Sequence, residues 1–418
     1  MDPRVEQQLT ALTQGEALRE RVLNALHRRS DKPIAVGIAY GGRINCASSA
    51  MDGEAADPAS IRVHTGCITK VLTATLVTEA VRAGVFSIDT PVSGLLGIRG
   101  SYNDAVLSGI TVKHLLEHTH GLDDSLVPEL PHSVEGWIDR EQLCARLAAN
   151  ATLAQPGLVH SYGNAGPWLA AALLENTLHE RYIDLLNRRI LGPMGMGEAS
   201  ENGDAGSICP ATGGALKTTV EGLLRFLLSA PLPHADLTPL PGWSSQEHGI
   251  RLGWKHYGSA WFGHNSALPG AAALARVLQP EGLAIVVSSG NHSLANILAR
   301  LFGNALPALA GVRVPRPLSA EETAALDLAP FVGTYANSAL MISITRSKPG
   351  TLQLQVFPRI GASTAVEPRM TATLRAAHDN VFYTVPAHTE LFPFVQFVEA
   401  PPARSRFLWN GRCVWPAL

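Results

Sequence analysis

The sequence predicts an α/β sandwich whose antiparallel sheet is assembled from both ends of one domain, followed by a small antiparallel β-domain. Three observations support this prediction. Two apolar runs separated by a Gly-Gly pair, at residues 33–50, predict a β-hairpin. Residues 85–245 are mainly helical and loop-rich in pattern. β-Branched residues at 285–287 then predict a buried strand, so the helical stretch is an insertion between two parts of one sheet.

The amino-terminal elements follow from local pattern. Residues 1–30 are charged throughout and predict one amphipathic surface helix. The turn of the hairpin is expected at Gly41-Gly42. Residues 64–77, "HTGCITKVLTATLV", begin as a loop and continue with apolar residues at helical spacing. This helix is expected to end at Gly84, because a glycine is favoured just after a helix C-terminus.

The remaining elements lie toward the carboxyl end. Residues 294–311 predict a helix that packs back on the sheet. Residues 313–330 mix prolines with charged residues and predict a linker. Beyond it, polar and apolar residues alternate around a Pro-Gly turn and short strands continue to the end. We therefore expect a large domain over 1–312, the linker, and a β-domain over 331–418.

The charge balance excludes two classes of partner. Lys and Arg total 33 against 35 Asp and Glu among 418 residues, and no basic block or acidic tail is present. Nucleic acids and anionic membranes are therefore not expected as partners. The amino terminus lacks an apolar signal-peptide core, and no stretch is both long and uncharged enough to span a bilayer. The expectation is a cytoplasmic protein, and nothing in the sequence indicates its oligomeric state.

Cysteine usage agrees with that expectation. The cysteines are odd in number and scattered, without a Cys-x-x-Cys pair, which is typical of reduced thiols. They are Cys46, Cys67, Cys144, Cys209 and Cys413.

Cys67 and Lys70 form the first candidate site. They are three residues apart at the start of a predicted helix and so project from the same face. A helix N-terminus and a nearby ammonium group both favour a thiolate. Cys67 is therefore a candidate nucleophile. Taken alone, the pair is more typical of a small buried cysteine beside a surface lysine.

Further motifs occur in the order of a known superfamily. "QPGLVHSYGNAGPWLAAALLE" carries Tyr162 and Asn164, and "WFGHNSALPG" leads into a strand. "ITVKHLLEHTHGL", "RRILGPMGMGEAS" and "CPATGGALKTTVEGLLRFL" look like additional landmarks. With them, residues 30–312 resemble the serine β-lactamase/penicillin-binding-protein superfamily, especially its class C β-lactamase and esterase branch. "APFVGTYANSALMISI" resembles the opening of lipocalin-like β-domains attached to some of its esterases and D-aminopeptidases.

The resemblance implies a β-lactamase-like α/β catalytic domain, with a helical insertion, and a C-terminal lipocalin-like antiparallel β-domain. It also implies site residues. Cys67 stands at the position of the nucleophilic serine and Lys70 at that of the following lysine. Tyr162 and Asn164 fill the second motif, with Tyr162 a candidate general base or proton relay.

The third motif, "HNS", departs from the family pattern. His264 takes its first position, and the backbone N–H groups of Cys67 and Ala267 would form the oxyanion hole. Ser266 replaces the expected glycine, and its side chain is expected to narrow the cleft or contact substrate. No lysine is present in this motif to anchor a β-lactam or peptide carboxylate. Reaction at an ester, thioester or amide is therefore favoured over β-lactam hydrolysis.

Three histidines are an alternative signal, for a metal site. His114, His118 and His120 have spacings that metal ligands can adopt. The family places a similar stretch at a structural helix end, so we favour a structural role. The glycines of "ATGGALKT" lack the ending of a phosphate-binding loop. No metal, nucleotide or other cofactor is expected.

A thiol in place of a serine favours transfer over hydrolysis, because thioesters react well with amines relative to water. We expect an acyltransferase working through a Cys67 acyl-enzyme, in the biosynthesis of a specialised metabolite. Its partners would be a small-molecule acyl donor and an amine or alcohol acceptor. A hydrolase of the same mechanism, such as an esterase or a D-aminopeptidase, is the main alternative. A non-catalytic binding protein is the third, and a cysteine engineered to trap an acyl-enzyme is the fourth.

Overall fold

The fold is that of a computed structural model. It describes residues 3–26, 34–49, 61–97, 107–123, 139, 142, 145, 152–197, 216–233, 238–239, 249–258, 260–268, 271–290, 318–319, 321–322, 326–337, 340–360, 363–364, 367–378, 381–385, 394–400, 405–409 and 413–416. The helix predicted over 294–311 lies outside these residues.

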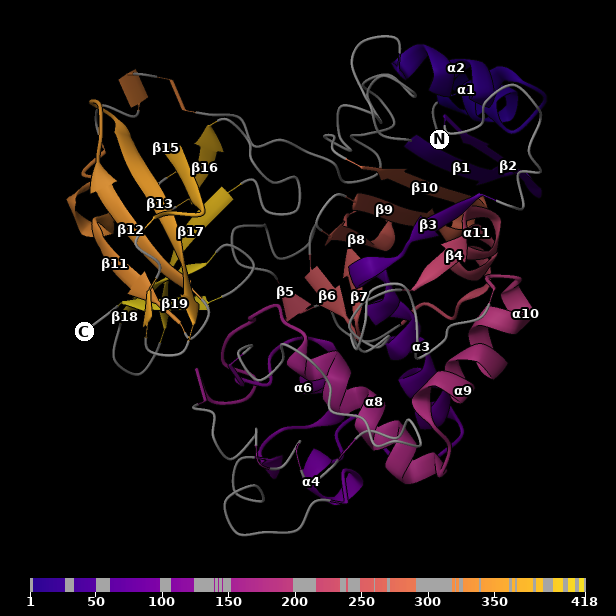
Figure 1. Cartoon of the computed structure of the whole chain (residues 1–418), viewed down its shortest axis with the longest axis horizontal. Coiled ribbons are helices and arrows are strands. Elements are labelled where there is room, and N and C mark those ends of the chain that lie inside the picture. The colour runs from indigo at the N-terminus through magenta and orange to yellow at the C-terminus, as the bar shows by residue number, and fades with distance from the viewer. Residues whose placement is uncertain are drawn as a thin grey trace.

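The first sheet joins strands from both ends of the larger domain, as predicted (Figure 1). Its order is β2-β1-β10-β9-β8-β7-β6-β5, and neighbouring strands are antiparallel. The strands are β1 (Ile34–Tyr40), β2 (Arg43–Ser48), β5 (Thr238–Pro239), β6 (Gly249–Arg251), β7 (Trp254–His256), β8 (Phe262–Leu268), β9 (Ala271–Leu278) and β10 (Leu283–Ser289). The predicted hairpin is confirmed: Gly41 and Gly42 both have positive φ, 58° and 75°, as a type I′ turn requires.

Both faces of this sheet are covered. Alternate residues of β1 point to opposite sides, and buried residues of this strand belong to two different apolar clusters. Ile34, Val36 and Ile38 belong to one apolar cluster, together with residues of the amino-terminal helices. On the opposite face Gly37 lets a helix approach closely. A Cβ there would lie 2.4 Å from Val220 Cγ1, on α11 (Val220–Ser229). A glycine is therefore needed at position 37 for this packing.

The amino-terminal segment forms two helices, where the sequence predicted one. They are α1 (Pro3–Leu12) and α2 (Ala17–Leu26). The chain turns between them at Gly15, whose φ is +59°. The turn lets Leu9 and Leu18, which are both buried, reach the same sheet face. A single straight helix would carry part of this apolar stripe away from the sheet.

The helical part of the larger domain covers the other face of the sheet (Figure 1). Besides α11 it contains α3 (Thr69–Arg82), α4 (Val92–Leu95), α6 (Val112–Leu116), α8 (Ala165–Leu178), α9 (Tyr182–Leu186), a π-helical turn (Asn187–Leu191) and α10 (Gly192–Met194). A short separate pair is formed by β3 (Arg62–His64) and β4 (Lys217–Thr219). The predicted end of α3 is confirmed, since Gly84 follows Ala83 with φ +73°. Among the described helices, none has the length and apolar character needed to cross a bilayer.

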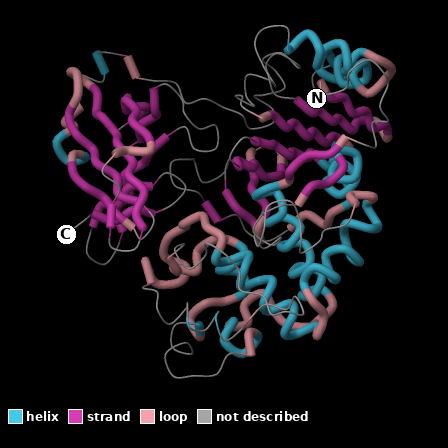
Figure 2. The backbone as a smooth tube through the Cα atoms, viewed as in Figure 1, coloured by secondary structure: helices cyan, strands magenta, loops and turns pink. Residues whose placement is uncertain are grey.

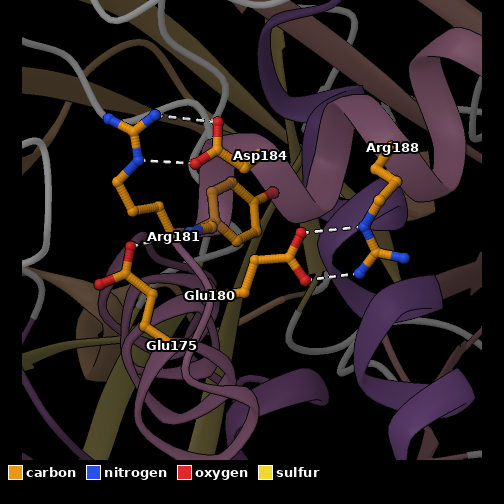
Figure 3. Close-up of polar contacts among 6 residues, drawn as sticks. Glu175, Glu180, Arg181, Asp184 and Arg188 are labelled. Atoms are coloured by element: carbon orange, nitrogen blue, oxygen red, sulfur yellow. Dashed lines mark hydrogen bonds and ion pairs between the residues drawn. The ribbon is translucent and has the colours of Figure 1, made fainter.

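The connection between α8 and α9 is held by charged side chains (Figure 3). Glu175, which is 6% exposed, accepts a hydrogen bond from the backbone N–H of Tyr182 at 2.8 Å. This contact satisfies a donor at the start of α9. The Tyr182 hydroxyl in turn lies 2.7 Å from Thr73 Oγ1 on α3. Since Thr73 is one helical turn after Lys70, the contact braces the helix that carries a predicted site residue.

The carboxyl-terminal strands form a second antiparallel sheet, separate from the first (Figure 2). Its order is β12-β11-β19-β18-β17-β16-β15-β13-β14, and the additional pairing of β12 with β13 closes eight of these described strands into a ring. They are β11 (Gly333–Ala336), β12 (Leu340–Arg346), β13 (Thr351–Ile360), β14 (Ser363–Thr364), β15 (Met370–His378), β16 (Val381–Val385), β17 (Phe394–Ala400), β18 (Ser405–Trp409) and β19 (Cys413–Pro416). Phe331, Phe382 and Phe397 are packed together within its core. The predicted fold class is confirmed.

The described part of the 313–330 segment packs on this second sheet. Leu318 donates a backbone hydrogen bond to Ala376 O at 3.0 Å, and Leu328 is buried in the same core. These residues are therefore attached to the β-domain. The domain limits at 312 and 330 stay a prediction.

Candidate active site

Cys67 lies in a tight turn immediately before α3. The sequence placed it in the first turn of the α-helix, whereas the structure has a 3₁₀ turn at Gly66–Ile68 and begins α3 at Thr69. The turn is fixed by Thr65, whose buried hydroxyl lies 2.8 Å from Thr69 Oγ1 and donates to Leu216 O at 3.0 Å. Cys67 is partly exposed at the end of this turn.

Lys70 and Tyr162 lie beside Cys67. Lys70 is 3% exposed, and its Nζ is 5.1 Å from the centroid of the Tyr162 ring. Tyr162 is also buried and precedes α8, whose N-cap residue is Asn164. The structure therefore brings the first two predicted motifs together, although Cys67 and Tyr162 are far apart in the chain.

The surroundings of Cys67 favour its thiolate. The partial removal of the thiol from water by itself raises its pKa. Lys70, the Tyr162 hydroxyl and Lys255 oppose this effect and hold the pKa of Cys67 below its ordinary value. Cys46 provides a contrast within the same chain, because burial raises the pKa of its thiol to about 12. Of these two thiols, Cys67 is the one whose pKa lies below its ordinary value.

We expect iodoacetamide to label Cys67 much faster than Cys46 at pH 7. An acid whose pKa is lowered loses its proton at a lower pH, so the labelling rate of Cys67 should reach half its maximum at a lower pH than that of an ordinary cysteine. Cys46 should stay unreactive until far higher pH. Peptide mapping of the labelled protein across a pH series measures both rates, and equal rates at every pH would contradict this assignment.

Lys255, which no sequence motif indicates, also lies beside Tyr162. It lies on β7, is 6% exposed, and its Nζ is 4.9 Å from the Tyr162 ring centroid. Burial lowers the pKa of Lys255 to about 8. Lys255 pairs with Gly263, next to His264 on β8. The third motif on β8 has no lysine, but Lys255 on the neighbouring strand β7 supplies a positive charge to the site. No local pattern in "LGWKHYG" indicates this position.

The third motif faces the site from β8. His264 is 2% exposed, and its ring centroid is 5.8 Å from that of Tyr162. Ser266, two residues later and on the same side of the strand, accepts a hydrogen bond from the Cys67 backbone N–H at 3.2 Å. Ala267 follows on β8, opposite Ala272. This contact places the Ser266 side chain against the Cys67 turn, while its expected effect on the cleft or the substrate stays a prediction.

Each of the three candidate metal-ligand histidines makes a structural contact, and for His120 it is a hydrogen bond that Nδ1 accepts from the Leu122 N–H at 3.0 Å. His114 caps α6, because its Nδ1 accepts a hydrogen bond from the Thr111 N–H at 3.2 Å. His118 is 2% exposed, with its ring centroid 4.7 Å from that of Tyr162, and its Nδ1 accepts from the Gly163 N–H at 3.4 Å. It therefore braces the second motif. Burial lowers the pKa of His118 well below its ordinary value, so its ring is neutral at pH 7. Within the described ranges, no group of three or more His, Cys, Asp or Glu residues could hold a metal ion.

Comparison with known proteins agrees with this arrangement. Residues 34–306 match the family described as Beta-lactamase. Penicillin-binding protein 4 of Amycolatopsis lactamdurans is 24% identical over 321 residues, which are 65% of this chain and 84% of that protein. The crystal structure of SurE with D-Leu has a TM-score of 0.64 at 23% identity and covers 99% of this chain and 100% of its own. The D-amino acid amidase of Ochrobactrum anthropi SV3 complexed with D-phenylalanine has a TM-score of 0.52 at 17% identity, over 71% of this chain and 99% of its own.

The matched region contains every predicted site residue, from Cys67 to Ala267. The two solved structures share the fold, and one of them extends over the β-domain as well. The chain therefore belongs to the beta-lactamase family and is an enzyme of the beta-lactamase fold.

Proposed function

We propose that the protein is an acyl-transfer enzyme that works through a thioester on Cys67. The observation that carries the proposal is the placement of Lys70 and Lys255 on the Tyr162 ring beside Cys67, where these three residues hold the pKa of the thiol below its ordinary value. A serine hydroxyl needs a base to become a nucleophile, whereas this thiolate is already favoured. The proposed acyl donors are esters, thioesters or amides, and the acceptors are amines or alcohols.

In the proposed acylation, the Cys67 sulfur attacks the acyl carbon. The carbonyl π electrons move to oxygen, and the oxyanion is bound by the N–H groups of Cys67 and Ala267. When the tetrahedral intermediate collapses, the bond to the leaving group breaks, and Lys70 or Tyr162 supplies the proton that this group takes up. The product of this half-reaction is a thioester, and the leaving group departs.

In the second half-reaction an amine or alcohol attacks the thioester carbon. The group that supplied the proton in acylation, Lys70 or Tyr162, takes the acceptor's proton, and the carbon–sulfur bond breaks to return Cys67 as a thiolate. Asn164 and His264 are proposed to complete the wall of the site around Tyr162. Water in place of the acceptor would give hydrolysis by the same steps.

The nature of the acyl group is suggested by the similar structures. One is a complex with D-Leu, and another is a D-amino acid amidase complexed with D-phenylalanine. We propose that the acyl donor carries a D-amino acid residue. The amidase, together with a D-stereospecific amidohydrolase from Streptomyces sp. of the same fold, supports a hydrolase as the second candidate. A cytoplasmic, biosynthetic role belongs to the first proposal.

Intact-protein mass spectrometry tests this function directly. The protein is incubated with matched thioester, ester and amide donors, each carrying a D- or an L-residue, with and without an amine acceptor. The expected result is an acyl adduct that maps to Cys67, forms faster with the D-donors and disappears on addition of the amine. An unmodified Cys67 with every donor would overturn the proposal.

Replacing Cys67 with serine is expected to lower the ratio of transfer product to hydrolysis product. The two side chains differ little in volume, so the fold should be kept, but the acyl-enzyme becomes an oxygen ester. That ester loses the preference of a thioester for amines over water. Chromatographic quantification of both products, at one fixed acceptor concentration, measures the ratio. If the unchanged enzyme hydrolyses its donor and ignores every acceptor, the hydrolase candidate replaces the transferase.

A further inference from the structure

The Ser266 hydroxyl is hydrogen-bonded to the Cys67 backbone N–H, a donor that the proposed reaction needs for the acyl oxygen. Its Oγ accepts from the Cys67 backbone N–H at 3.2 Å, and its side chain is only 2% exposed. If the proposed function holds, the acyl oxygen must bind this same N–H during attack by the Cys67 sulfur. One N–H group forms one good hydrogen bond at a time, so the Ser266 hydroxyl and the acyl oxygen compete for it.

The backbone of Ser266 cannot easily withdraw from this position. Ser266 lies in the middle of β8 and pairs with Ala273 on β9, in a ladder that extends from Phe262 to Leu268. Moving its Cα would break that ladder, so the hydroxyl can leave the Cys67 N–H most simply by rotation about χ1. A glycine, which the third motif was expected to have here, has no side chain to compete.

We propose that Ser266 restrains acylation, because its hydroxyl holds the oxyanion donor of Cys67 in the free enzyme and must rotate away before a donor reacts. The restraint acts on the oxygen of the acyl group and leaves the sulfur of Cys67 unaffected. Ser266 thus sets how readily the enzyme accepts an acyl group, a role that the glycine of the family motif could not have.

The test uses Ser266→Ala, which removes only the hydroxyl. The second-order rate constant for acylation of Cys67 is measured from leaving-group release, with 4-nitrophenyl acetate and with the acetyl thioester of N-acetylcysteamine. It should rise about two- to tenfold, the factor that corresponds to one neutral hydrogen bond. The factor should be the same for both probes, because the hydrogen bond is lost in the free enzyme that both reactions share.

Alkylation by iodoacetamide separates this effect from a change in the thiolate. Substitution at a saturated carbon forms no oxyanion, so the alkylation rate of Cys67 should not change in Ser266→Ala. The matched control is Ser289→Ala: Ser289 is also 2% exposed and lies on β10 of the same sheet. Both rates should stay at their original values in that variant.

The outcomes distinguish this inference from the function on which it rests. Acylation that is unchanged or slower in Ser266→Ala overturns the restraint, and a slower rate would make the hydroxyl a donor to the acyl oxygen. An equal rise in alkylation also overturns it, since the thiolate itself would then have changed. Failure of both probes to acylate Cys67 in the unchanged enzyme overturns the proposed function and the inference together.

Discussion

Replacing Cys67 with alanine is expected to abolish turnover of every acyl donor. Alanine offers no nucleophilic atom, and in this mechanism the covalent intermediate is the only route to product. The side chain is partly exposed at the end of a turn that Thr65 holds in place, so its removal should leave the fold intact. Turnover is measured by product formation, and folding by thermal unfolding of both proteins.

Cys46→Ala is the control for this experiment. Cys46 is buried in the core of the first sheet, and the pKa of its thiol is raised to about 12, so it has no expected part in the reaction. Its variant should keep the specific activity of the unchanged enzyme. Full activity in Cys67→Ala would show that the nucleophile lies elsewhere and would overturn the proposed mechanism.

Replacing Lys70 with methionine is expected to lower the turnover rate by about two to four orders of magnitude, as is typical of a proton-transfer group. Methionine keeps most of the length of the side chain and suits a position that is 3% exposed. The ammonium group, however, is the strongest of the influences that lower the pKa of Cys67 against the effect of burial. Its loss raises that pKa, so the iodoacetamide profile of Cys67 should move to higher pH.

Lys255→Met gives the matched comparison for Lys70→Met. Both lysines are buried, and their Nζ atoms lie at similar distances from the Tyr162 ring centroid, 5.1 Å for Lys70 and 4.9 Å for Lys255. Lys255 lowers the pKa of Cys67 less than Lys70 does, so its variant should shift the labelling profile in the same direction but by less. A larger shift in Lys255→Met would show that Lys255, not Lys70, lowers the pKa of Cys67 more. No shift in either variant would show that neither lysine favours the thiolate.

Local pattern determined much of the fold. The Gly41-Gly42 hairpin and the end of α3 at Gly84 were predictable, because each depends on a backbone conformation that glycine favours within a few residues. The order of the motifs indicated the family, and with it the candidate roles of Cys67 and Lys70. The break between α1 and α2 was not predictable, since an isolated glycine in a helical pattern is a weak signal.

The sequence by itself determined which residues carry the three motifs, and only the tertiary structure decided what surrounds them. Ser266 and Cys67 are 199 positions apart, and their hydrogen bond exists because β8 lies against the turn before α3. Lys255 enters the site because β7 pairs with β8, and His118 reaches Tyr162 from the end of α6. Contacts of this kind depend on which elements become neighbours in space. Periodicity and turn residues predict only the local conformation of the chain, so they carry no information about contacts between distant segments.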